Sequence, residues 1–322
     1  MVTDGQSPFL AGVLNWLGDA VMLLPALAAF AEAHPDSPLA AYGRGGLQSV
    51  YRMGLGVRLS AYVPLPRDGG MKEAVRAVRA LHAREAFVLP ASPRAAWVPF
   101  AARVPRRRGF AGHFPRRFLL TDVVPLPPDA GRRHQVFEAY AVLGLPPPAE
   151  RPRARLEVPP WAVREACALA GGDGGWVAVL PGAARGNAKQ YAPERFAAVA
   201  RGLREKTGRR AVVLGSAGEK AVCEAVAAAC GGKNLAGATG IETLAGILAK
   251  SAVVLCNDSG GMHLAAAVGA KVVAFLGITD PEVTGPLTDK AVILQHAARR
   301  ARDIPRESPE ARAALDAISP KE

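Results

Sequence analysis

The sequence is poor in residues that would link it to disulfide chemistry or to a bilayer. Its 322 residues include only four cysteines, and no two of them form a C-x-x-C pair. Three of the four fall within helical or strand patterns that should bury them, so we expect reduced structural thiols. No apolar stretch reaches the roughly 18 residues that a membrane-spanning helix needs, and the first four residues offer no basic start of a signal peptide. We therefore expect a cytoplasmic protein. The cysteines are Cys167, Cys223, Cys230 and Cys256.

Several ligand-binding signatures are also missing. The stretch Gly43-Arg44-Gly45-Gly46 does not supply the G-x-G-x-x-G dinucleotide fingerprint, and no Walker A loop occurs. Neither a D-x-D pair nor a cluster of His and Cys ligands is present to hold a metal on a diphosphate. We therefore expect no cofactor and no essential metal. Phosphate charge must then be met by Lys189 and by helix N-termini.

The chain carries a clear excess of positive charge. It has 40 Lys and Arg against 28 Asp and Glu, a formal net charge of +12. This excess favours anionic partners such as nucleotides, phosphorylated sugars or an acidic membrane surface. Residues 1–150 hold 17 basic against 11 acidic residues, and the remainder holds 23 against 17. A basic tail is therefore not its source, and little aromatic interleaving argues against nucleic acid.

One cluster of arginines surrounds Gly109-Phe110-Ala111-Gly112. Such a run is either a solvated face or an anion-binding surface, and the sequence leaves both interpretations open. Its members are Arg103, Arg106, Arg107, Arg108, Arg116 and Arg117.

Length and proline content predict two domains. A chain of 322 residues is too long for most single cores. Residues 145–160 contain six prolines, which disrupt both helices and central strands. We place the boundary there, with an N-terminal domain over residues 1–150 and a C-terminal domain over residues 151–322.

The pattern of apolar runs and helical stretches predicts an α/β fold with two Rossmann-like parallel sheets. In the second domain strands and helices alternate with little ambiguity, which implies βαβ units. We expect two such domains joined by a proline linker, with a cleft between them. The predicted strands are 9–14, 39–42, 62–65, 86–89, 118–124, 176–180, 211–214, 234–235, 253–256 and 272–276. The predicted helices are 19–33, 72–82, 135–143, 193–206, 219–230, 242–250 and 262–268.

The most informative segment is the apolar run 252–256, which passes directly into Asn257-Asp258-Ser259-Gly260-Gly261-Met262-His263 and then into an Ala-rich helical stretch. This order is typical of a buried strand that ends at a helix N-terminus. The first N–H groups of that helix, with Ser259 and two glycines beside them, predict a phosphate pocket. His263 lies in the first turn, either as a packed side chain or facing the anion.

Three further loops at predicted strand ends carry polar residues. Asp19 follows the first strand and either complements a helix dipole or acts as a base. Residues 180–191 contain glycines with Arg185 and Lys189, which can neutralise phosphate. Glu219 lies at a helix start, either as a dipole complement or as an acceptor for a ribose hydroxyl.

Together these segments resemble the ADP-heptose:lipopolysaccharide heptosyltransferases, glycosyltransferase family 9, and within it the heptosyltransferase II branch. The resemblance extends from about residue 9 to residue 287, in the family's order and spacing. The matching segments are Asn15-Trp16-Leu17-Gly18-Asp19-Ala20-Val21-Met22, Pro181-Gly182-Ala183, Ala188-Lys189, Pro193-Glu194-Arg195-Phe196, Asn257 to Ala265, Gly277-Ile278-Thr279-Asp280-Pro281 and Thr284-Gly285-Pro286. Tyr191 stands where the family commonly has Trp, and Ile278 where Pro is usual. Residues 291–302 replace a segment with Cys and His that many relatives carry.

The resemblance implies a GT-B architecture and an inverting transfer of heptose from ADP-heptose to the lipopolysaccharide inner core. It implies that Asp19 is the catalytic base and that Lys189 contacts the diphosphate. It also implies a donor site formed by Arg185, Lys189, Glu219, Thr239, Gly240, Ile241, Asp258, Ser259, Gly260, Gly261 and His263. We further predict that Arg106, Arg107 and Arg108 meet an anionic, lipid-linked saccharide acceptor at the inner face of the cytoplasmic membrane.

Three other functions remain open. The chain could be a GT-B transferase of another nucleotide sugar, a transferase that glycosylates protein, or a non-catalytic nucleotide-sugar-binding protein. Asp19 in its loop argues against the last of these.

Overall fold

The computed structural model describes residues 7–67, 69–183, 189–296, 304 and 308–321. The chain forms two compact units, Met1–Ala154 (unit 1) and Arg155–Glu322 (unit 2). The division lies inside the proline-rich segment 145–160, close to the predicted boundary after residue 150.

Unit 1 is built on a sheet of six parallel strands in the order β3-β2-β1-β4-β5-β6. Residues of β1, β2 and β4 are almost all buried, as expected for strands covered on both faces. The strands are β1 (Phe9–Gly12), β2 (Leu39–Arg44), β3 (Leu59–Leu65), β4 (Glu85–Val88), β5 (Arg106–Phe110) and β6 (Asp122–Val124).

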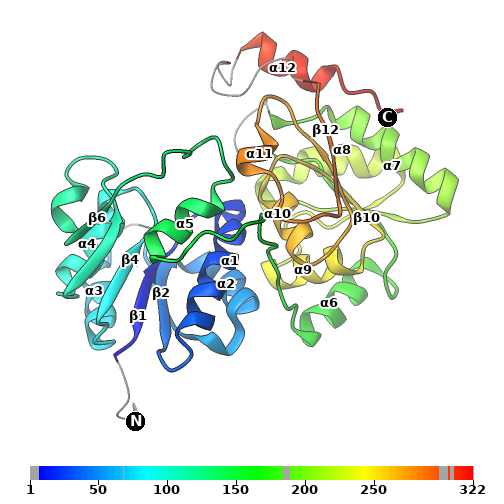
Figure 1. Cartoon of the computed structure of the whole chain (residues 1–322). Coiled ribbons are helices and arrows are strands. Elements are labelled where there is room, and N and C mark those ends of the chain that lie inside the picture. The colour runs from blue at the N-terminus through cyan, green and yellow to red at the C-terminus, as the bar shows by residue number, and fades with distance from the viewer. Residues whose placement is uncertain (1–6, 68, 184–188, 297–303, 305–307, 322) are drawn as a thin grey trace. The chain divides into compact units, whose positions relative to one another are not determined.

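Helices cover both faces of this sheet (Figure 1). Helix α1 packs against α2 and α5 on one face, and α3 packs against α4 on the other. Between α3, α4 and the sheet lies a core that includes Leu10, Tyr42 and Val78. The helices are α1 (Leu17–Ala33), α2 (Gln48–Leu55), α3 (Met71–Ala80), α4 (Pro93–Ala101) and α5 (Val136–Leu143), with 3-10 turns η1 (Gly45–Leu47), η2 (Gly56–Arg58) and η3 (Arg116–Leu119).

Unit 1 differs from the sequence-based expectation in its helices, because α2 and α4 were not predicted, and in the last two strands of its sheet. The predicted strand over 118–124 is largely wrong, because residues 116–119 form η3 and only Asp122–Val124 is extended. The strand β5 was not predicted, although it lies inside the sheet between β4 and β6. Its three consecutive arginines obscured the apolar run that identifies an internal strand.

Arg116 is a fully buried arginine in η3, beside the end of β4. Its Nη2 donates to the carbonyl of Val88 at 2.7 Å. Burial lowers the pKa of its guanidinium group below the ordinary value. A Cβ added at Gly109 would lie 2.8 Å from Arg116 Nη2 and 2.7 Å from the Val88 carbonyl oxygen. Glycine at position 109 therefore leaves space for the guanidinium group of the buried Arg116.

Unit 2 repeats the architecture of unit 1 with the order β12-β11-β10-β7-β8-β9, again parallel throughout. Every strand predicted for this half is present within two residues of its expected ends. Strand β12 lies outside those predictions. The strands are β7 (Val177–Leu180), β8 (Ala211–Val213), β9 (Lys233–Asn234), β10 (Val253–Asn257), β11 (Val272–Phe275) and β12 (Ala291–Leu294).

The helices of unit 2 also form two layers (Figure 1). Helices α7 and α8 pack together on one face, and α9 packs against α6 and α10 on the other. Leu315 of α12, and Ile318, which follows that helix, belong to the core that α7 and α8 also form. The helices are α6 (Pro160–Ala170), α7 (Pro193–Thr207), α8 (Lys220–Cys230), α9 (Ile241–Lys250), α10 (Gly260–Ala267), α11 (Pro281–Thr284) and α12 (Pro309–Asp316), with a 3-10 turn η5 (Ala217–Glu219).

Each sheet has the doubly wound strand order in which the first and fourth strands of the unit are neighbours. In such sheets the chain leaves those two strands in opposite directions, and ligands bind at their carboxyl ends. That switch point lies between β1 and β4 in unit 1 and between β7 and β10 in unit 2.

Candidate functional site

In unit 2 an ion pair lies at the switch point. Lys189 Nζ donates to Asp258 Oδ2, joining the loop after β7 to the residue that follows β10. The two side chains are only 16% and 7% exposed. A largely buried ion pair holds both groups in one geometry, because separating the charges in a poorly solvated site is costly. The sequence predicted both residues for the donor site, and the structure brings them together.

Asn257 connects the same two loops, and the sequence analysis gave it no role of its own. It is the last residue of β10 and is fully buried. Its Nδ2 donates to the carbonyl oxygens of Pro181 at 2.8 Å and Gly182 at 3.3 Å, while its Oδ1 accepts from the Tyr191 N–H at 2.9 Å. One amide thereby fixes the chain on both sides of Lys189. An uncharged polar residue at the end of a buried strand is the signal that points to such a role.

Tyr191 anchors the far side of this loop. It is fully buried and stacks on Phe275 of β11, with ring centroids 4.3 Å apart. Its hydroxyl donates to the carbonyl of Ile318 at 3.0 Å, and Arg195 donates to the same carbonyl at 2.8 Å. The segment after α12 thus supports the loop that carries Lys189.

The N-terminus of α10 lies next to Asp258. Ser259 is its N-cap residue, with extended backbone, and within the described residues its side chain makes no capping hydrogen bond. His263 and Gly261 are buried. A Cβ added at Gly261 would clash with Leu180 Cδ2. Glycine at this position therefore lets α10 pack closely on β7.

Glu219 has a structural task in the loop after β8. Its Oε2 accepts from the backbone N–H and the hydroxyl of Ser216, both at 2.7 Å, which completes a capping box at η5. Its Oε1 lies beside Gly182, where an added Cβ would collide with the carboxylate. The carboxylate of Glu219 therefore lies close to the loop after β7, at Gly182. Its predicted contact with a ribose hydroxyl stays a prediction.

Three further predicted donor residues lie in the segment that leads from β9 into α9. Thr239 and Gly240 precede α9, with Gly240 as its N-cap and Ile241 as its first residue. They follow β9, which is paired with β8. Arg185 lies outside the described residues.

In unit 1 Asp19 lies in the first turn of α1, which follows β1. It is partly buried, and a carboxylate there complements the positive end of the helix. Asn15, in the same loop, accepts from the Arg44 N–H at 3.2 Å. The position is thus the one that the sequence predicted, at the carboxyl end of a strand on the switch point.

Tyr51 is the buried neighbour of this carboxylate. Burial first, then the charges of Tyr62 and Asp19, raise the pKa of Tyr51 well above its ordinary value. Its hydroxyl donates to the carbonyl of Leu14 at 3.0 Å. It stays protonated at any physiological pH and holds the loop between β1 and α1 in place.

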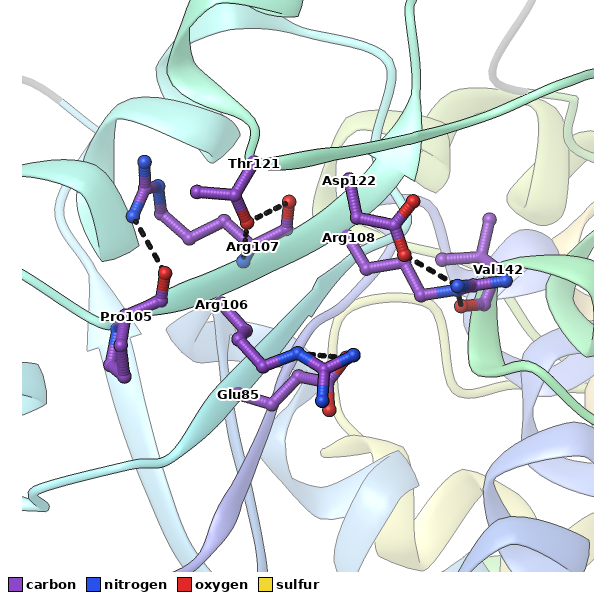
Figure 2. Close-up of polar contacts among 8 residues, drawn as sticks. All are labelled: Glu85, Pro105, Arg106, Arg107, Arg108, Thr121, Asp122 and Val142. Atoms are coloured by element: carbon purple, nitrogen blue, oxygen red, sulfur yellow. Dashed lines mark hydrogen bonds and ion pairs between the residues drawn. The ribbon is translucent and has the colours of Figure 1, made fainter.

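The three arginines predicted to contact the acceptor lie on β5 (Figure 2). Arg108 Nη1 pairs with Asp122 of β6 at 2.5 Å, and its Nε donates to the Val142 carbonyl of α5 at 2.9 Å. Arg106 Nε lies 3.9 Å from Glu85 of β4, with its side chain 68% exposed.

The side chain of Arg107 lies on the opposite face of the sheet from those of Arg106 and Arg108, because side chains alternate along a strand. Its Nη1 donates to the Val104 carbonyl at 2.6 Å and its Nε to the Leu119 carbonyl at 2.8 Å. Arg107 and Arg108 therefore fasten β5 to its neighbours. Their contact with an acceptor stays a prediction.

The thiols behave as expected. All four cysteines are free, and Cys223, Cys230 and Cys256 are buried. Burial, with a smaller contribution from the Glu219 charge, raises the pKa of Cys223 to about 12. Among the residues that the structure describes, no cluster of three or more His, Cys, Asp or Glu could hold a metal. In the same part of the chain, no helix has the length and apolar character of a membrane span.

Two doubly wound sheets, each with polar loops at its switch point, define a two-domain α/β protein of the nucleotide-binding type. The sequence profile of glycosyltransferase family 9 (heptosyltransferase) matches residues 72–313. The chain is 31% identical to lipooligosaccharide heptosyltransferase 2 of Haemophilus influenzae over 65% of each sequence, which is less than two thirds of that protein. It is 30% identical to lipopolysaccharide heptosyltransferase 2 of Salmonella typhimurium over 72% of each.

A solved structure has the same fold. ADP-heptose LPS heptosyltransferase II of Escherichia coli superposes with a TM-score of 0.82 at 24% identity, covering 98% of this chain and 95% of that one. The chain belongs to glycosyltransferase family 9. The resemblance found in the sequence and the predicted GT-B fold are both confirmed.

Proposed function

We propose that this chain is an inverting glycosyltransferase that transfers heptose from ADP-heptose to the inner core of lipopolysaccharide. Family membership and relatives named as lipooligosaccharide or lipopolysaccharide heptosyltransferases support the reaction class. The observation that carries the proposal is the Lys189 ammonium group, held by Asp258 at the switch point of unit 2 beside the N-terminus of α10.

The donor half of the reaction is assigned to unit 2. Lys189 and the N-terminal N–H groups of α10 neutralise the diphosphate of the bound donor and of the departing ADP. Asp258 orients Lys189, and Ser259, Gly260, Gly261 and His263 complete the pocket. No metal is needed in this scheme, because the fixed cation and the helix supply the positive charge.

The nucleoside part of the donor is assigned to neighbouring loops. Glu219 accepts from a ribose hydroxyl, and the backbone of residues 239–241 borders the adenine. Arg185 adds positive charge near the phosphates.

The acceptor half is assigned to unit 1. Asp19 takes the proton from the acceptor hydroxyl as that oxygen attacks the anomeric carbon of heptose. The bond from that carbon to the ADP oxygen breaks on the opposite side, so the configuration inverts. Arg106, whose side chain is the most exposed of the three arginines on β5, is the strongest candidate for contact with an anionic acceptor.

The test is a titration with ADP, UDP and GDP followed by transfer assays with the corresponding sugars. We expect ADP to raise the melting temperature most, since a ligand at 100 times its Kd adds about 2.7 kcal/mol of stability. We also expect heptose transfer to a deacylated lipopolysaccharide core to persist in EDTA. Equal stabilisation by UDP would favour another nucleotide sugar. Transfer only to protein would change the acceptor, and binding without transfer would indicate a non-catalytic protein.

A further inference from the structure

Exposed aromatic side chains are concentrated in one part of unit 1. Among the residues that the structure describes, six aromatic side chains are exposed, and four of them fall between positions 97 and 118. They are Trp97, Phe100, Phe114 and Phe118, with exposed fractions of 39%, 45%, 81% and 66%. Such a concentration of solvent-exposed aromatic side chains is typical of a surface that binds an apolar partner.

Ring contacts, a shared helix and Arg107 link these aromatics with one another. Phe114 and Phe118 meet edge to face with centroids 5.8 Å apart. Trp97 and Phe100 lie three residues apart on α4 and so share one side of that helix. Arg107 joins the two pairs, because its guanidinium carbon lies 5.5 Å from the centre of the Phe100 ring and its Nε bonds the Leu119 carbonyl, next to Phe118.

Arginines add positive charge to the same surface. Residues 86–121 contain seven arginines and no Asp or Glu; of these, Arg116 is fully buried, and Arg106 and Arg108 lie on the other face of β5 from Arg107. Arg117 lies over the Phe118 ring at 5.6 Å, and the exposed Arg103 follows α4, its N–H bonded to the Phe100 carbonyl at 3.0 Å. We call these four aromatics, with Arg103, Arg107 and Arg117, the aromatic–arginine patch.

We propose that the aromatic–arginine patch docks unit 1 on an anionic lipid bilayer. Aromatic rings partition into the interface between headgroups and acyl chains, and arginines pair with lipid phosphates in the same layer. An acidic protein partner would supply the charge but not a continuous apolar phase for four exposed rings. A bilayer meets both demands. The inference goes beyond the transfer reaction, because vesicle binding needs neither donor nor acceptor.

The test measures co-sedimentation with vesicles of mixed phosphatidylcholine and phosphatidylglycerol. The apolar variant is Phe114→Ser with Phe118→Ser, and the cationic variant is Arg103→Ser with Arg117→Ser. The matched control is Trp161→Ser, which removes an aromatic side chain of 49% exposure from α6 of unit 2. Far-ultraviolet circular dichroism and ADP affinity report whether each variant is folded.

We expect the wild-type chain and Trp161→Ser to bind mixed vesicles equally, and binding to weaken with added salt. The apolar variant should bind about tenfold more weakly or worse. Each arginine removed should weaken binding about fivefold, corresponding to about 1 kcal/mol per basic residue at the surface.

Three results would overturn the proposal: equal binding to pure phosphatidylcholine vesicles, full binding by both variants, or a concentration-dependent dimer that the apolar variant abolishes. The last would assign the patch to a second copy of the chain. Because ADP affinity and transfer to a water-soluble core are measured separately, loss of vesicle binding is distinguishable from failure of the proposed reaction.

Discussion

Units 1 and 2 share one strand order but hold different chemistry at the same position. At the switch point of unit 2, an ion pair and the Asn257 amide cross between the loops after β7 and β10. In unit 1 the loop after β1 presents the carboxylate of Asp19, supported by backbone contacts of Asn15 and Tyr51. The comparison shows that one scaffold carries an ion-paired lysine at the switch point of unit 2 and a carboxylate at the switch point of unit 1, so the short loops and helix starts decide which charged group stands there.

The largest expected effect comes from a change to the proposed catalytic base in unit 1. Asp19→Asn keeps the shape of the side chain and removes its basicity, so turnover should fall by about two orders of magnitude or more. ADP affinity and melting temperature should stay near wild type, because the residues proposed to bind the donor belong to unit 2. Single-turnover rates measure the first, and calorimetry the other two. Asp36→Asn, an exposed acid in the same unit, is the control. A fully active Asp19 variant would leave unit 1 with a purely structural role.

A second prediction breaks the ion pair of unit 2. Lys189→Ala leaves the buried Asp258 carboxylate without its partner and should destabilise the protein by about 3 kcal/mol. It should also weaken ADP binding and slow transfer together.

Adding Asp258→Asn to that variant separates the two effects. The double variant should recover much of the stability, since no unpaired charge remains, but not the ADP affinity. Denaturant unfolding and ADP titration of the single and double variants test this. Recovery of both would mean that Lys189 acts only by neutralising Asp258.

A third prediction compares one asparagine from each unit. Asn257→Ala removes a fully buried amide that fixes both sides of the Lys189 loop, so we expect a loss of about 2 kcal/mol and weaker ADP binding. Asn15→Ala removes one exposed hydrogen bond in unit 1 and should change stability by less than about 1 kcal/mol. Equal losses from the two changes, measured by urea unfolding, would contradict the positioning role of Asn257.

The smallest effect at neutral pH belongs to a thiol whose contribution changes only in alkaline solution, and it too separates the units, because all four cysteines lie in unit 2. Burial raises the pKa of Cys223 to about 12, so the folded state disfavours the thiolate that the unfolded chain forms from about pH 9 upward. The contribution of the protonated Cys223 thiol to the free energy of unfolding is fully present below pH 9. It is lost between pH 9 and 12, at up to about 1.4 kcal/mol per pH unit. Cys223→Ala should flatten the pH dependence of the unfolding free energy in that window, and an unchanged slope would show that this thiol does not contribute.

The sequence predicted unit 2 better than unit 1, for a physical reason. In unit 2 the strands β7, β10 and β11 are short apolar runs next to stretches of clear helical periodicity, so these elements could be placed, whereas β12, α6, α11 and α12 were not predicted. In unit 1 the strand β5 begins Arg106-Arg107-Arg108, and its place in the sheet depends on partners far along the chain: Glu85, Asp122 and the carbonyls of Leu119 and Val142. Such pairings cannot be read from local pattern.

The candidate site shows the same limit. Asp19, Lys189 and Asp258 were found because loops at strand ends carry polar residues, and the pairing of Lys189 with Asp258 adds a contact between loops that are distant in sequence. Glu219 was placed correctly at a helix start, with the capping box as the observed interaction. The supporting roles of Asn257 and Tyr191 required the three-dimensional structure, since each depends on contacts with several separate segments.

The buried Arg116 makes the sequence of unit 1 interdependent. Alanine at Gly109 would press on both Arg116 and the Val88 carbonyl, and any side chain at Gly112, with a φ of +60°, would also come within 2.8 Å of Arg116 Cδ. Selection for folded protein from a library that varies residue 109 alone should therefore recover glycine at that position. One that varies 109 and 116 together should accept alanine at 109 when a smaller residue replaces the arginine and the backbone near Val88 relaxes. The tolerance of one position is thus set by the occupant of another, which is epistasis that arises from packing.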